Sequence, residues 1–145
     1  ADGSIDVLGD GILVKTVQWL HSVKMPPNKD VQLTVMHQMQ ATSEPWPYVV
    51  PDGFWLGLTD ATVQAKVSLI ASYFVLHGVF AVPSHIGAFA FRTPIVLGPG
   101  TKIDAHLINN APVEQWMNAS VQGLLVEKTG DDYREAFVGL FKGAP

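Results

Sequence analysis

The sequence predicts an all-β protein, an antiparallel β-sandwich or jelly roll. Between residues 50 and 127, short apolar runs are separated by Gly, Pro, Asn and Asp at strand-length intervals. After the Gly-Pro-Gly turn at residues 98–100, the apolar residues Ile103, Ala105 and Leu107 alternate with polar ones. Successive side chains leave a strand on opposite sides, so this alternation is typical of a strand that packs on one face only.

The chain divides into three parts. The divisions are marked by Gly, Pro, Asn and Asp residues and by a change in the spacing of the apolar residues near the C-terminus. Residues 1–10 are rich in Gly and Asp and predict an extended, flexible arm that clasps a neighbour. Residues 11–131 are the predicted sandwich domain, and residues 132–145 the predicted C-terminal amphipathic helix. Within the domain, strands are predicted at residues 12–23, 31–39, 55–58, 63–75, 79–82, 88–91, 95–97, 103–108 and 120–127.

Two of these strands also fit a helical pattern. Residues 12–23 alternate as in a strand, while Leu13, Val17 and Leu20 stand at helical spacing. Their β-branched content favours the strand. Residues 63–75 show the same ambiguity, and alternation matches more positions there.

Residues 31–39 follow a turn at residues 25–30 that contains two prolines. They alternate cleanly and predict a strand with Val35, His37 and Met39 on one face. His37 is therefore expected to be the histidine that is partly buried and sensitive to pH.

Three aromatic residues outside the strand patterns are candidates for contact with a ligand or partner. Trp46 and Tyr48 lie in residues 41–52, where three prolines predict an exposed loop or edge, and Trp116 lies beside another loop. A large ring in a loop either caps the end of the β-core, anchors a protein interface or stacks on a sugar. Trp19 and Trp55 fall within strand patterns and are predicted core residues.

The C-terminal helix is predicted from spacing. The stripe of an amphipathic helix is formed by Tyr133, Ala136, Phe137, Leu140 and Phe141. We expect this helix to plug one end of the sandwich or to dock on another subunit, so Phe137 and Phe141 join the candidate interface residues.

Composition points to a surface covered by a partner. Hydrophobic residues make up 48% of the 145 residues and charged residues only 15%, well below the roughly 25% that is usual. The net charge of −4 and the scattered nine Lys and Arg residues disfavour nucleic acid and membrane surfaces as partners. The low-charge run at residues 67–91 is broken by Gly78, Pro83 and Gly87, which disfavours a membrane-spanning helix.

No residue pattern predicts catalysis, a metal site or a cofactor. The five histidines do not pair at metal-ligand spacing, and the chain has no cysteine. It also has no Gly-x-Ser-x-Gly motif, and no two carboxylates stand out as a pair for glycoside hydrolysis. The sequence therefore predicts a protein without catalytic residues. A hydrolase whose site leaves no sequence signal is kept as a further hypothesis, beside the two given below.

Three phrases of the sequence resemble a known kind of protein. They are VVPDGFWLGLTD at residues 49–60, FRTPIVLGPGT at residues 91–101 and SVQGLLVE at residues 120–127. Similar phrases occur in small jelly-roll virion proteins of tailed phages and in related carbohydrate-facing jelly rolls. The resemblance implies a non-enzymatic structural protein on a virus particle, a capsid decoration or attachment protein that forms a homotrimer. The alternative is a carbohydrate-binding β-sandwich module that binds a glycan through its loop aromatics.

Overall fold

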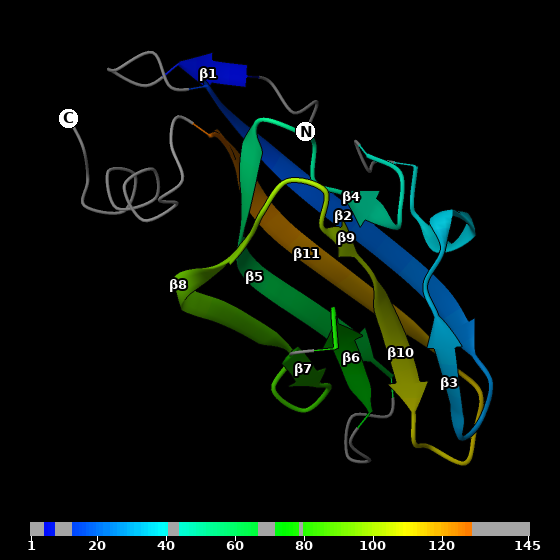
Figure 1. The fold of residues 1–145 in the computed structure, drawn as a ribbon. Helices are drawn as coiled ribbons and strands as arrows, with labels where there is room; N and C mark the ends of the chain where they lie inside the picture. Colours follow the sequence, from blue (N-terminus) through cyan, green and yellow to red (C-terminus); the bar gives the residue numbers. More distant parts are fainter. Residues whose placement is uncertain (1–4, 8–12, 41–43, 67–71, 79, 129–145) are drawn as a thin grey trace.

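The computed structural model describes residues 5–7, 13–40, 44–66, 72–78 and 80–128, and these residues form antiparallel β-sheets (Figure 1). The elements are β1 (Ile5–Val7), β2 (Leu13–Met25), β3 (Lys29–Gln32), the 3₁₀-helix η1 (Val35–His37), β4 (Tyr48–Val49), β5 (Phe54–Ala65), β6 (Tyr73–Leu76), β7 (Phe80–Pro83), β8 (Ala88–Leu97), β9 (Lys102–Ile103), β10 (Ala105–Asn109) and β11 (Gln115–Glu127). The all-β prediction is confirmed.

The strands form two main sheets and one small one. The five-stranded sheet has the order β1-β2-β11-β5-β8, and the four-stranded sheet has the order β3-β10-β6-β7. The two sheets lie in layers, one over the other, and β4 pairs with β9 at one end (Figure 1). The arrangement is sandwich-like, because residues of both sheets contribute to one core.

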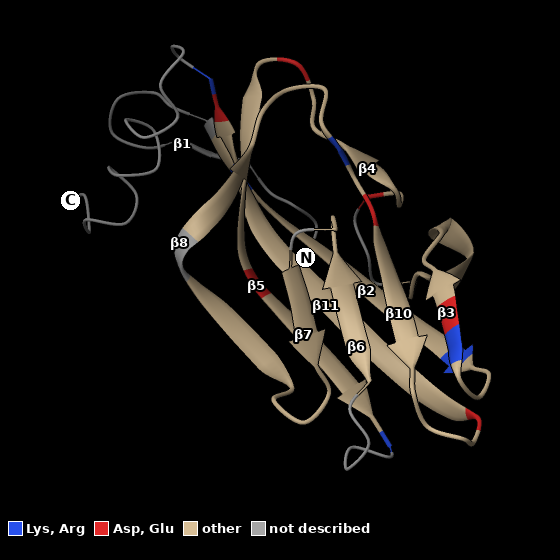
Figure 2. Ribbon diagram, turned by 60° about the horizontal axis from the view of Figure 1, so that its bottom comes forward, with Lys and Arg blue, Asp and Glu red and all other residues tan. Residues whose placement is uncertain are grey.

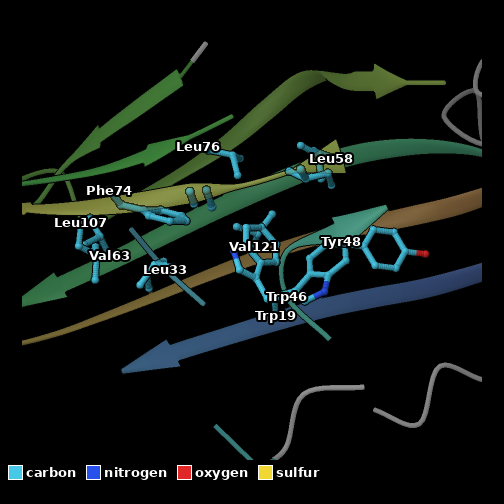
Figure 3. Packing of buried hydrophobic residues seen from close by; sticks show 14 of the residues in the cluster. Trp19, Leu33, Trp46, Tyr48, Leu58, Val63, Phe74, Leu76, Leu107 and Val121 are labelled. Carbon is cyan, nitrogen blue, oxygen red and sulfur yellow. The ribbon is translucent and has the colours of Figure 1, made fainter. Parts of the chain in front are cut away.

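The core follows directly from the period-two pattern of the strands. Along β11, Met117, Ala119 and Val121 are buried, while Trp116 before them and Asn118 among them are exposed. The longest strand pairing joins β11 to β2, from Gln115 opposite Met25 to Val126 opposite Val14. Side chains of β2, β5 and β11 meet those of β6, β7 and β10 between the layers (Figure 3).

One glycine is required where β5 and β11 approach closely. A Cβ atom on Gly123 would lie 2.8 Å from the carbonyl oxygen of Gly57, a distance that side-chain carbons do not tolerate. The register of the β5–β11 pair shifts between Gln122 and Gly123. Gly123 thus permits the close contact beside this irregularity, because it has no side chain.

Most predicted strands are present, with changed boundaries. The ambiguous segments at residues 12–23 and 63–75 contain strands in their described parts, and the predicted strands at 88–91 and 95–97 are one strand, β8. Strand β5 continues from the predicted strand at residues 55–58 through Asp60 into the one predicted at residues 63–75. Residues 67–71 lie outside the described residues.

The strand predicted at residues 31–39 is wrong beyond Gln32. Leu33 is still buried, but Thr34 caps the 3₁₀-helix η1 that follows. The Thr34 hydroxyl accepts a hydrogen bond from the Met36 N–H at 3.3 Å, and the Thr34 N–H donates to Nδ1 of His37 at 3.0 Å. These local hydrogen bonds offer the backbone an alternative to the sheet, which alternation alone does not reveal.

The two ends of the chain are described to different extents. Within the predicted arm, Ile5–Val7 forms strand β1 and pairs with Leu13–Lys15 of β2. The predicted helix at residues 132–145, with Phe137 and Phe141, lies outside the described residues. Its role therefore stays a prediction.

Candidate functional site

Trp46 and Tyr48 are buried, so the prediction that they stand in an exposed loop is wrong. They are only 2% and 6% exposed, and both pack on Trp19 with ring centroids 5.4 and 4.9 Å away (Figure 3). Pro45, before Trp46, and Pro47, between the two aromatic residues, are exposed. The proline-rich segment therefore alternates like a strand, and its aromatic side chains cover the end of the core.

This segment is held in place by one side chain of the η1 region. Oε1 of Gln38 accepts a hydrogen bond from the Trp46 N–H at 2.7 Å, and Nε2 of Gln38 donates to the Glu44 carbonyl at 2.7 Å. Burial, and then the nearby Glu44 carboxylate, raise the pKa of Tyr48 to about 12. Tyr48 is consequently neutral at physiological pH and acts as a packing residue.

The most buried histidine is His21, whereas the sequence had pointed to His37. His21 is 1% exposed on β2, and its ring lies 5.0 Å from that of Trp46 in an edge-on contact. Among the described residues, none makes a hydrogen bond to either ring nitrogen. Burial, and then repulsion from His37, lower the pKa of His21 to about 4. His37 itself is only half-buried.

Two other histidines lie near carboxylates on the solvent side of the four-stranded sheet. Nδ1 of His106 is 2.6 Å from Oδ1 of Asp30, and Nδ1 of His77 is 4.0 Å from Oδ1 of Asp104. Each of these contacts joins one histidine to one carboxylate. In the part of the chain that the structure describes, no three His, Cys, Asp or Glu side chains gather where they could hold a metal ion.

One edge of the molecule has almost no charge. We call β7, β8 and the turn between them (residues 80–97) the charge-poor edge. Between Lys66 and Lys102 the sequence has a single charged residue, Arg92. Figure 2 shows the described parts of β6, β7 and β8 without acidic or basic residues, unlike the strands on the other side. Because β7 and β8 each end their sheet, no described strand pairs with the outer side of either.

Three phenylalanines join the two sheets at the charge-poor edge. The ring of Phe80 on β7 lies 4.8 Å from Phe89 and 4.7 Å from Phe91, both on β8. The contacts are edge-to-face, the geometry that aromatic pairs favour. Phe89 is still 42% exposed, and Ile86 in the adjoining turn is 54% exposed. The cluster thus continues from the core onto the surface.

Among the predicted aromatic candidates that lie in described residues, Trp116 is the one on the surface. It is 56% exposed on the outer face of β11 and lines a hollow of about 510 Å³ with Gln64, Lys66 and Asn118. The loop before it is fixed by Asn109, whose Oδ1 accepts a hydrogen bond from Nε2 of Gln115 at 2.8 Å. Trp116 therefore stands on a rigid base, far more accessible than Trp46 or Tyr48.

Sequence reasoning missed Phe89 and Ile86 as surface residues. The sequence signal for them is the run without charged residues at 67–91. No helix among the described residues is long and apolar enough to cross a membrane. Neither protein-family models nor curated protein sequences give a match to this chain.

Proposed function

We propose that the chain has the jelly-roll topology. Leaving out the short strands β1, β4 and β9, the described residues form eight strands. One sheet then contains the first, eighth, third and sixth of them, and the other contains the second, seventh, fourth and fifth. This order is what results when a long antiparallel hairpin of strands is wrapped into two facing sheets. Jelly rolls are frequent among viral capsid and lectin domains.

The proposed function is that of a non-enzymatic structural protein that assembles with copies of itself and with a larger lattice. The observation that carries this proposal is the charge-poor edge. Natural proteins guard an open sheet edge with charged side chains, proline or a covering segment, since an unguarded edge pairs with other chains. Here β8 ends its sheet, and its charged residue and its proline, Arg92 and Pro94, both stand beyond residue 91. The first part, residues 88–91, has neither, and Phe89 is exposed there with alanines on either side of it.

The resemblance to jelly-roll virion proteins supplies the setting of the proposal. We propose a homotrimer that decorates the capsid of a tailed phage, with the charge-poor edge in the contact between subunits. An exposed apolar patch at an edge is typical of protein interfaces, whose buried centres are depleted of charged residues. Low overall charge fits a surface that is partly covered in the assembly.

Sedimentation velocity of the full chain at micromolar concentration tests the assembly. We expect a species larger than the 15.7 kDa monomer. A variant with two added charges, Ile86→Lys with Ala90→Lys, should weaken self-association at least tenfold, because both side chains are exposed at this edge. The matched control, Val35→Lys with Val113→Lys, adds the same charge at exposed positions elsewhere.

Two results would overturn the assembly proposal. One is a wild-type chain that stays monomeric up to the highest soluble concentration. The other is an equal effect of the two lysine pairs, since the edge would then have no special role. The virion setting has its own test, which is quantitative mass spectrometry of purified phage particles. Presence in stoichiometric amounts is expected, and presence only in the particle-free fraction contradicts it.

A further inference from the structure

The outer face of the five-stranded sheet presents polar side chains in three rows that cross β2, β11 and β5. The strand register aligns each row, because Asn118, Ser120 and Gln122 of β11 have direct partners on both neighbouring strands. The rows are Ser22–Asn118–Gln64, Leu20–Ser120–Thr62 and Gln18–Gln122–Asp60. We call these nine residues the polar strip. Seven of the nine carry an amide or a hydroxyl, Asp60 is the one ionisable residue, and Leu20 is the one apolar member.

Hydrogen bonds between neighbouring strands order part of this strip. The Ser22 hydroxyl donates to Oδ1 of Asn118 at 2.6 Å, and the hydroxyls of Thr62 and Ser120 are hydrogen-bonded to each other. Gln64, Asn118 and Gln122 nevertheless remain exposed to solvent. The strip is therefore a surface on which some groups are already positioned and the longer amides are accessible.

The strip is hollowed along the strands. The hollow beside Trp116 shares Gln64 and Asn118 with a second one of about 210 Å³, which reaches Thr62 and Ser120. A third hollow, of about 340 Å³, is lined by Gln18 and Gln122 further along the strip, among other residues. From residue 116 to residue 122 a strand extends about 20 Å. That length suits a chain of several units better than a single small molecule.

Charge limits what can bind there. An acidic ligand would find few cationic side chains. Nζ of Lys24, at the Trp116 end of the strip, is already 3.4 Å from Oε1 of Glu114, and Lys66 lines the hollow beside Trp116. An apolar partner would bury hydroxyls and amides without replacing their hydrogen bonds to water, which costs free energy. An uncharged ligand with many hydroxyl groups matches the strip in both respects.

We propose that the polar strip binds a neutral oligosaccharide, with Trp116 as the platform on which one sugar ring stacks. The flat indole ring offers apolar area to the C–H face of a sugar. Gln64 and Asn118 stand beside it and offer both donors and acceptors to sugar hydroxyls. The strip lies on the sheet face, and only the Trp116 hollow reaches the charge-poor edge, at Ser84 and Gly87. The sugar site and the proposed assembly therefore adjoin there and need separate tests.

Calorimetric titration of the full chain with cellohexaose, maltohexaose and chitohexaose tests the inference. At least one of these neutral hexasaccharides should bind. Trp116→Ala should weaken that binding at least tenfold, Trp116→Phe should retain most of it, and Gln64→Ala should weaken it several-fold. The control Met36→Ala, which truncates an exposed side chain on η1, should leave it unchanged.

Three results would overturn the inference. None of the three hexasaccharides binds; or one binds with an affinity that Trp116→Ala leaves unchanged; or heparin, a polyanion, binds more tightly than all of them. Sedimentation velocity of Trp116→Ala keeps the two proposals apart. An unchanged size with lost sugar binding supports a glycan site separate from the interface. A smaller assembly without sugar binding in the wild type assigns Trp116 to a protein contact instead.

Discussion

The two sides of the molecule treat their open sheet edges in opposite ways. On one side β3 is short, carries Lys29 and Asp30 on its exposed surface, and is followed by the helix η1. On the other side the charge-poor edge has exposed Phe89 and Ile86. Charged side chains on an edge strand disfavour pairing with other chains, whereas an edge poor in charge favours it. The difference indicates which side solvent covers and which side a partner covers.

The largest expected effect concerns the phenylalanine cluster. Phe80→Ala should lower the free energy of unfolding by about 3 kcal/mol, because it removes the ring that joins β7 to β8. Urea unfolding followed by tryptophan fluorescence measures this. At the β3 edge, Val31→Ala should cost only about 1 kcal/mol. If the two costs were equal, the cluster would contribute no special link between the sheets.

A pH titration tests the side opposite the charge-poor edge, because His21 lies on β2. Its pKa of about 4 in the folded chain is below the ordinary value of 6.5. Protonation therefore favours the unfolded chain, so stability is complete above pH 6.5 and falls as the pH drops toward 4. The loss should be about 2 kcal/mol at pH 5.

Denaturant unfolding between pH 7 and 4.5 measures this loss, with His21→Leu as the comparison. The leucine variant has no group to protonate at this position, so its stability should decline less steeply over the same range. A decline of the same steepness in both proteins would show that other groups cause the acid sensitivity.

The smallest expected effect is at the β3 edge itself. Asp30→Asn removes the carboxylate that contacts Nδ1 of His106, and the Asp30 side chain is more than half exposed. Solvent screens such pairs, so unfolding should change by no more than about 0.5 kcal/mol. Sedimentation velocity should show no change in assembly. A change in size would mean that the β3 edge also contacts a partner.

The sequence predicted those strands in which apolar and polar residues alternate and only one face is buried. Ile103, Ala105 and Leu107 are buried as expected, because nothing local competes with the strand there. The strand predicted from alternation beyond Gln32 is wrong, because Thr34 caps a 3₁₀-helix there.

Of the candidate site residues that the structure describes (Trp46, Tyr48 and Trp116), only Trp116 is exposed. Prolines around Trp46 and Tyr48 indicate a segment outside the main sheets, but they do not reveal that it crosses the end of the core. The polar strip depends on the register of three strands that are distant in the chain, and no single-sequence pattern contains that register.

The central place of β11 has a consequence for how the protein is made. A ribosome completes β2 and β5 long before β11, which pairs with both of them. Until β11 emerges, both earlier strands lack their shared neighbour in the sheet. Their unpaired edges can then associate with other nascent chains. Translation that stops before residue 115 should therefore yield insoluble material, while a shortened chain that retains β11 stays soluble.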